Sequence, residues 1–205
     1  MTRAEMHSML GNLLNDPSEG RYDSGVKDNA LNHTVLSFVQ LLPTSMLGEL
    51  FKRVESKTTG AGIDDTDSTR TRLTKAATAL FDPIAVKFVS GGYRKISTNV
   101  RYWFTPIATD NLWQLEYNLS ADSVKSCRVE DSDLYFYLYP QRPTGYYIDI
   151  NYLKAPATIA SGTDCDLNVL LHSLIVIYTA FILRGKPEDA SHALQAYIQE
   201  KGGGR

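Results

Sequence analysis

The stretch LYFYLYPQRPTGYYIDINY, residues 134–152, decides the fold class. Apolar or aromatic residues recur at every second position on both sides of its central turn, at Leu134, Phe136, Leu138, Tyr146, Ile148, Ile150 and Tyr152. Period-two alternation gives a strand one buried face, so the stretch predicts two strands joined as a hairpin. Similar runs at 84–89 and 113–119 extend this prediction to a small, mainly antiparallel sheet.

Helical patterns flank the sheet on both sides. Thr2 and Glu5 have the spacing of a capping box, and apolar residues then recur with helical period. A second amphipathic helix begins near Asp23 and is closed by Pro43. After the sheet, a long apolar helix capped by Thr163, Asp164 or Asp166 ends at Gly185, and a final helix begins at Pro187.

This order predicts an α+β fold in which the C-terminal helix pair packs with the N-terminal helical hairpin. We expect one domain, 1–205, divided into N-terminal helices (1–43), a central mainly β region (44–156), C-terminal helices (157–201) and a tail (202–205). Within the central region, residues 56–70 (SKTTGAGIDDTDSTR) have almost no apolar anchor. They predict a long, exposed and flexible loop.

The overall charge limits the classes of partner. The chain has 21 Lys and Arg against 23 Asp and Glu, a formal net charge of −2. A protein that coats nucleic acid needs a basic surface, so this balance argues against that class. It still allows a protein that surrounds DNA without gripping it.

The sequence has no pattern typical of secretion or of membrane insertion. Cys127 and Cys165 lie far apart, as isolated reduced thiols do. The first fifteen residues are amphipathic, unlike a signal peptide. The apolar segment Leu167–Leu183 contains Asn168 and His172, so we expect a buried central helix and no membrane contact.

The residues that could act in catalysis are explained more simply by structural roles. No phosphate-binding loop, GxSxG, HExxH or CxxC motif is present. Asp164 and Asp166 have positions typical of helix-capping residues. His172 and His192 lack the further ligands that a metal site needs, and the same holds for His7 and His33 on the first two helices. Asp149 is expected on an exposed sheet face. We therefore predict a protein that is not an enzyme, with no metal and no cofactor.

Tyrosine is the unusual residue of the composition, with 12 in the chain. Cross-strand aromatic pairing explains their crowding around 135–152. A subunit interface explains it equally well, because Tyr combines apolar area with a polar tip. The candidate interface residues are Tyr135, Tyr137, Tyr139 and Tyr147.

A small basic cluster surrounds Tyr93, Tyr102 and Trp103. Its members are Lys87, Arg94, Lys95 and Arg101. A solvated face is the first interpretation of this cluster, and a contact with DNA in a channel is the alternative.

The order of several motifs resembles the head-to-tail adaptor proteins of tailed bacteriophages. The N-terminal part carries Arg21-Tyr22-Asp23, then Val26, Ala30-Leu31-Asn32 and a closing Leu41-Leu42-Pro43. The later part carries Leu138-Tyr139-Pro140, Tyr147-Ile148-Asp149-Ile150-Asn151-Tyr152 and Ala155-Pro156, followed by a helix pair. Each motif alone is weak, and the resemblance rests on their order and spacing along most of the chain. The Thr-rich segment 56–70 departs from a minimal version of the family.

The resemblance implies a structural virion protein that forms a ring of about twelve copies beneath the portal protein. Such a ring extends the DNA channel, contacts tail or other neck proteins, and assembles in the host cytoplasm. In the family, the terminal helix and tail commonly hold the portal. The corresponding candidates here are Gln195, Gln199, Glu200, Lys201 and Arg205. DNA is expected to pass without specific binding, since many phosphate contacts would retain it.

Three other functions remain open at this point. The chain could be another neck or tail-completion protein, a small interaction domain outside viruses, or a hydrolase that uses Asp149 or the Asp164/Asp166 pair. The paired terminal helices favour the adaptor over neck proteins built mainly from strands.

Overall fold

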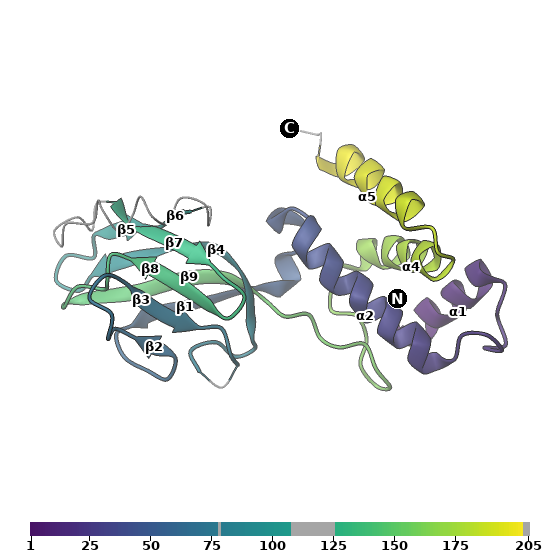
Figure 1. The fold of residues 1–205 in the computed structure, drawn as a ribbon, viewed down its shortest axis with the longest axis horizontal. Helices are drawn as coiled ribbons and strands as arrows, with labels where there is room; N and C mark the ends of the chain where they lie inside the picture. Colours follow the sequence, from purple (N-terminus) through teal and green to yellow (C-terminus); the bar gives the residue numbers. More distant parts are fainter. Residues whose placement is uncertain (78, 108–125, 203–205) are drawn as a thin grey trace. The chain divides into compact units, whose positions relative to one another are not determined.

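The computed structural model describes residues 1–77, 79–107 and 126–202 (Figure 1). The chain forms two compact units, a helical unit of Met1–Leu50 and Pro156–Arg205 and a β unit of Phe51–Ala155. The predicted α+β class is confirmed. The β unit lies within the central region predicted at 44–156.

The helical unit is built around its apolar helix. The helices are α1 (Arg3–Leu14), α2 (Ser24–Leu41), α4 (Val169–Leu183) and α5 (Pro187–Gly202), with the 3-10 turns η1 (Thr44–Met46) and η2 (Gly48–Leu50). Helix α4 contacts α1, α2 and α5, so the predicted packing of the two helix pairs is confirmed. No helix in the described part of the chain is long and apolar enough to cross a membrane.

Local capping fixes where these helices begin. The Thr2–Glu5 capping box is present, and the Asp23 carboxylate accepts a hydrogen bond of 2.8 Å from the Val26 amide. The cap predicted for α4 is wrong, because Asn168 accepts from Leu170 N while Asp164 and Asp166 bind elsewhere. Asp164 accepts from Arg3 N and Asp166 accepts from Ala157 N.

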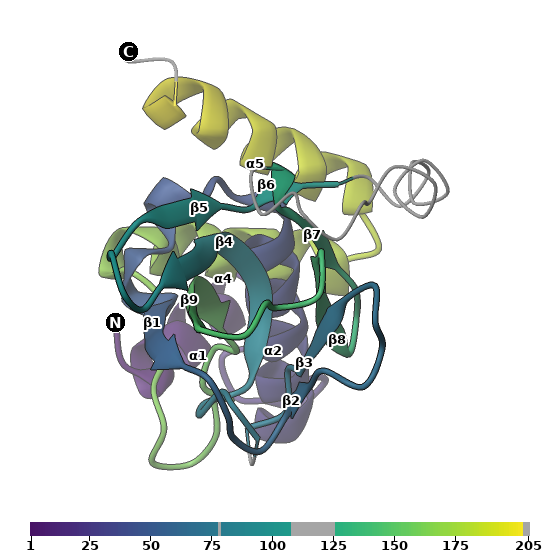
Figure 2. The same ribbon diagram turned by 90° about the vertical axis from the view of Figure 1, so that its left-hand side faces the viewer.

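The β unit is a sandwich of two sheets (Figure 2). The four-stranded sheet has the order β1 (Phe51–Lys57), β9 (Tyr146–Lys154), β4 (Ala85–Lys95) and β5 (Arg101–Trp103). The five-stranded sheet has the order β2 (Ile63–Asp64), β3 (Thr71–Thr74), β8 (Tyr135–Tyr139), β7 (Arg128–Asp131) and β6 (Thr105–Pro106). Only β6 and β7 pair in parallel among these described strands.

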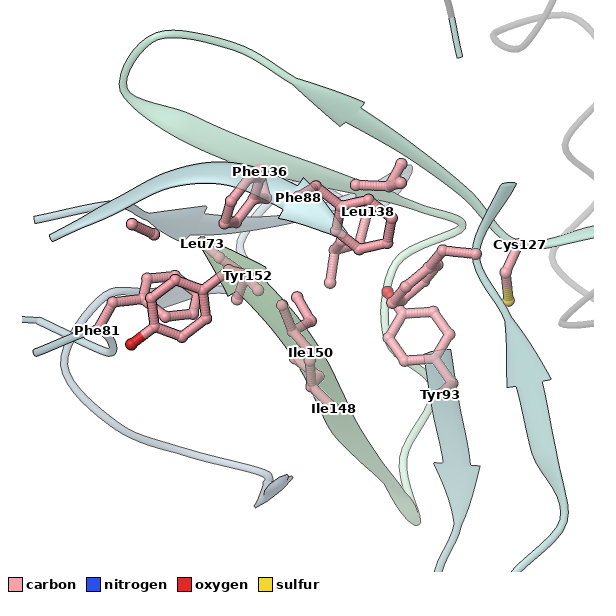
Figure 3. Packing of buried hydrophobic residues seen from close by; sticks show 13 residues of the cluster. Leu73, Phe81, Phe88, Tyr93, Cys127, Phe136, Leu138, Ile148, Ile150 and Tyr152 are labelled. Atoms are coloured by element: carbon pink, nitrogen blue, oxygen red, sulfur yellow. The ribbon is translucent and has the colours of Figure 1, made fainter. Parts of the chain in front are cut away.

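Aromatic and aliphatic side chains from both sheets fill the space between them (Figure 3). Phe81 contacts Tyr152 edge to face with ring centroids 4.7 Å apart, and Tyr93 contacts Phe104 in the same way at 4.9 Å. Such contacts add to the stabilisation from apolar burial. The Tyr93 hydroxyl, buried in this core, donates to the Pro140 carbonyl oxygen at 2.8 Å.

The predicted hairpin of 134–152 is wrong, although its strands are present. Strand β8 pairs with β3 and β7, whereas β9 pairs with β1 and β4 of the other sheet. A strand of a sandwich buries one face whether its sequence neighbour lies beside it or in the facing sheet. The alternation of apolar residues therefore could not distinguish a hairpin from a connection between two sheets.

Three other local predictions need correction. The segment 56–70 contains the end of β1 and the strand β2, so it is not a continuous loop. Ile84 lies just before β4 and is 47% exposed, whereas Ala85 is buried. Within β4 the register is irregular between Ala85 and Lys87 and between Phe88 and Ser90, which interrupts the predicted alternation. Leu134 is 67% exposed because it lies just outside β8. The strand expected at 113–119 lies outside the described residues.

We predict that Gly92→Ala destabilises the β unit by about 2–3 kcal/mol, because overpacking forces the backbone to move. A Cβ atom at Gly92 would lie 2.3 Å from the Tyr102 carbonyl oxygen, across the β4–β5 pair. Urea unfolding followed by circular dichroism measures the change. Gly48→Ala is the control, because nothing lies within 4 Å of its Cβ position. Equal unfolding midpoints for the two variants would contradict the close approach of the strands.

Candidate functional site

The outer face of the five-stranded sheet carries a cluster that we call the tyrosine–arginine surface. It consists of Arg70, Arg72, Glu130, Tyr135 and Tyr137. Side chains alternate along β8, so the burial of Phe136 and Leu138 in the core places the two tyrosines on the opposite face. The Arg70 guanidinium carbon lies 4.6 Å from the Tyr137 ring centroid, and that of Arg72 lies 4.9 Å from the Tyr135 centroid. These are cation–π distances.

Acidic neighbours hold the two arginines over their rings. Arg70 Nε donates to Asp67 Oδ2 at 2.9 Å, and Arg72 forms an ion pair with Asp64. Glu130 lies opposite Tyr137 on β7, and its burial raises the pKa of the carboxyl group while Arg70 opposes that shift. Tyr and Arg in such a preordered arrangement are the residues that contribute most to protein–protein interfaces.

The four predicted interface tyrosines do not form one surface. Tyr135 and Tyr137 are half-buried on the tyrosine–arginine surface, but Tyr139 is only 4% exposed. The Tyr139 hydroxyl accepts from Arg70 at 3.2 Å, so this residue belongs to the packing of the unit itself. Tyr147 lies on the other sheet, where Arg94 covers its ring at 4.8 Å.

A buried charge network lies on the outer face of the four-stranded sheet. Asp149 is 5% exposed, so its expected position on a solvated face is wrong. Its carboxylate accepts from Arg94 Nε at 2.7 Å, from Arg101 Nη2 at 2.8 Å and from the Ser56 amide at 2.8 Å. No signal in the sequence near Asp149 indicates these donors, because they lie 48 to 93 residues away.

The network keeps Asp149 ionised. Burial by itself raises the pKa of a carboxyl group. At Asp149, the hydrogen bonds from Arg94, the Ser56 amide and Arg101 outweigh burial and lower the pKa below its ordinary value of 3.8. The carboxylate thereby holds the two arginines in place on this face of the sheet.

The portal-contact candidates lie on the terminal helix α5. Ala190 and Leu194 are buried, whereas Gln195, Gln199 and Glu200 are exposed, so α5 presents a polar face to solvent. Lys201 also belongs to α5, but its side chain and the whole of Arg205 lie outside what the structure describes.

The residues considered for catalysis are not brought together. His172 Nε2 donates to the Leu167 carbonyl oxygen at 2.8 Å, and its Nδ1 lies 2.9 Å from the terminal amino group. His192, by contrast, is exposed on α5. Across residues 1–77, 79–107 and 126–202, no three His, Cys, Asp or Glu side chains are grouped so that they could hold a metal ion. Cys127 is buried, which raises its pKa to about 12.

A hollow of about 510 Å³ lies at the turn between β8 and β9. Thr58, Asp65, Ser68, Gln141 and Arg142 are among its lining residues. Arg142 Nη2 donates to Asp65 Oδ2 at 2.6 Å, and Asp65 also accepts from the Thr71 hydroxyl. These polar groups connect the turn to the segment before β3, which is a structural role.

Comparison of the sequence with family models and with curated proteins gives no match.

We predict that Asp149→Asn lowers the free energy of unfolding by about 3 kcal/mol at pH 7, because it removes the charge that two half-buried arginines require. A carboxyl group with a lowered folded pKa stabilises the fold above its unfolded pKa and loses that effect as pH falls through the folded pKa. The difference between wild type and variant should be constant above about pH 4.5 and shrink below pH 3.8. Urea unfolding at a series of pH values measures it. A difference that does not change with pH would show that the charge of Asp149 is not the cause.

Proposed function

We propose that this chain is a non-enzymatic structural protein of a tailed-phage virion, the adaptor between head and tail. It forms a ring beneath the portal protein, extends the DNA channel and gives the tail its attachment surface. The observation that carries the proposal is the ordered series of motifs, from Arg21-Tyr22-Asp23 to Ala155-Pro156, that resembles this family.

The position of the first motif supports this assignment. Asp16 accepts hydrogen bonds from the amides of Gly20, Arg21 and Tyr22, which orders the turn before α2. The Tyr22 hydroxyl donates to the Leu183 carbonyl oxygen at 3.1 Å. The motif thus connects the start of α2 to the end of α4, and it fixes the region from which the terminal helix α5 departs.

Two surfaces have the properties that an adaptor needs. The polar face of α5 is exposed, as a portal-binding helix requires. The tyrosine–arginine surface has the composition of a subunit interface. A closed ring is built from heterologous contacts, so each copy must offer such a surface to its neighbour.

For portal binding, native mass spectrometry of the chain mixed with the portal ring from the same source should yield a complex with about a dozen copies per ring. Gln195→Ala/Gln199→Ala should weaken this complex by about tenfold, which corresponds to about 1.4 kcal/mol. Glu188→Ala, in the first turn of α5, is the control and should bind as wild type does. If no complex forms at any salt concentration, the portal-docking role fails, and a neck protein further down or an unrelated interaction module takes its place.

For ring assembly, Tyr137→Ala should lower the number of copies bound per portal while changing the free energy of unfolding by only about 1 kcal/mol. Tyr147→Ala is the matched control, because Tyr147 is also half-buried beneath an arginine but lies on the other sheet. Copy number is counted by native mass spectrometry, and stability by urea unfolding. Parallel loss of copy number and stability in Tyr137→Ala would instead assign Tyr137 to the packing of the β unit.

A further inference from the structure

The carboxyl group of Glu130 lies on the tyrosine–arginine surface without a partner. Glu130 is only 8% exposed. It forms no hydrogen bond and no ion pair with any residue that the structure describes. Nearly all buried polar side chains in folded proteins have such a partner, and a buried carboxylate that lacks one destabilises the fold. Departures of this kind are typical of functional sites, so Glu130 indicates a partner outside the chain.

The arginines near Glu130 do not satisfy it. Arg70 Nε donates to Asp67 Oδ2 at 2.9 Å, and Arg70 Nη1 donates to the Tyr139 hydroxyl at 3.2 Å. Its positive charge lowers the pKa of the Glu130 carboxyl group less than burial raises it. Arg128 lies two residues away on the same strand and forms no ion pair with Glu130. A direct donor must therefore come from another molecule.

The neighbouring tyrosines suit a lysine as that donor. Glu130 on β7 lies opposite Tyr137 on β8, and both side chains are on the outer face of the sheet. Arginines hold the rings of Tyr135 and Tyr137, so these rings are ordered before a partner binds. A lysine has an apolar stem and a charged head, so its stem can pack on half-buried tyrosine rings while its ammonium group reaches the carboxylate.

The β unit itself contains a surplus of such donors. The strands of the four-stranded sheet carry eight basic residues, three on β1, three on β4 and one each on β5 and β9, against two acidic residues. The strands of the five-stranded sheet carry two basic residues and three acidic ones. The two sheets are therefore complementary in charge, which favours a second copy of this chain as the partner.

Strand β1 carries the lysines that are most accessible to a second copy. It is an edge strand, and β9 is its one neighbour among the strands that the structure describes. Lys52 lies opposite Tyr152 and Lys57 lies opposite Ile148, so both lysines project from the same face of β1. Both are exposed, and neither forms an ion pair with a described residue. Two free ammonium groups thus lie along one edge of the unit.

We propose that the Glu130 carboxylate forms an ion pair with Lys52 or Lys57 of a neighbouring copy. Strands β1 and β7 belong to different sheets and lie on opposite sides of the β unit (Figure 2). One copy can therefore present β7 to one neighbour and β1 to the other, as a closed ring of heterologous contacts requires. The inference rests on the ring of the proposed function and identifies the charged contact between its copies.

Carbodiimide coupling tests this contact, because it joins a carboxyl group directly to an amine that touches it. Isotope-labelled and unlabelled full-length chains are mixed in equal amounts and treated both at high concentration and in the portal complex. We expect peptides that join Glu130 of one isotope to Lys52 or Lys57 of the other. Glu130→Gln should lose these peptides. Glu55→Gln is the control and should keep them, because Glu55 is exposed on β1 and pairs with Arg53.

Charge reversal tests the identity of the two partners. Lys52→Glu/Lys57→Glu should lower the yield of the mixed-isotope link at least about tenfold, because it leaves Glu130 facing negative charge. Adding Glu130→Lys to this variant should restore a link in which the amine and the carboxyl group have exchanged places. Lys87→Glu is the matched control, because Lys87 also lacks an ion pair with any described residue but lies on β4. An equal loss in this control would overturn the proposal.

Unfolding of the free chain separates this role from a role in packing. The charged and titratable neighbours of Glu130 are Arg70, Arg128, Tyr137 and Tyr139. Because burial raises the folded pKa, the ionised carboxyl group lowers stability at pH 7, and this effect is lost as pH falls below the ordinary value of 4.5. Glu130→Gln should therefore raise the urea midpoint at pH 7 and leave it unchanged at pH 4 or below. A lower midpoint at pH 7 would assign Glu130 to packing and overturn the proposal.

Failure of this contact and failure of the adaptor role give different results. A portal complex with its full number of copies but without a mixed-isotope link at Glu130 would overturn the contact and leave the adaptor role intact. A link at Glu130 in the free chain without any portal complex would support the contact and overturn portal docking. Absence of the link from both samples would overturn the contact.

Discussion

The carboxylate of Asp149 links all four strands of the four-stranded sheet. From its position on β9 it accepts hydrogen bonds from Ser56 on β1, Arg94 on β4 and Arg101 on β5. A buried carboxylate that lacks partners costs several kcal/mol, so these donors must be in place together for the sheet to form. The irregular register of β1 between Val54 and Lys57 brings the Ser56 amide to this acceptor.

The same network shapes the surface of the β unit. Because Asp149 fixes the ends of Arg94 and Arg101, their guanidinium groups lie over Tyr147 and Trp103. On the opposite sheet, Asp64 and Asp67 do the same for the arginines above Tyr135 and Tyr137. Both outer faces thus combine arginine with aromatic rings.

Charge is divided between the units as well as between the sheets. The helical unit has seven Lys and Arg against eleven Asp and Glu, whereas the β unit has fourteen against twelve. A net charge for the whole chain averages over these differences, so it does not describe the surface of either unit. Electrostatic attraction depends on the local field within about 10 Å, and that field follows the fold.

The sequence by itself determined the α+β class, the capping of α1 and α2, and the presence of β8 and β9, because caps and apolar periods depend on residues close together in the chain. The apolar period of α5 likewise predicted that Gln195, Gln199 and Glu200 lie on its exposed face. Only the tertiary structure decided that β8 and β9 belong to different sheets and that Asp149 is buried. Each of these depends on partners tens of residues away, and strand pairing leaves no local pattern that names its partner.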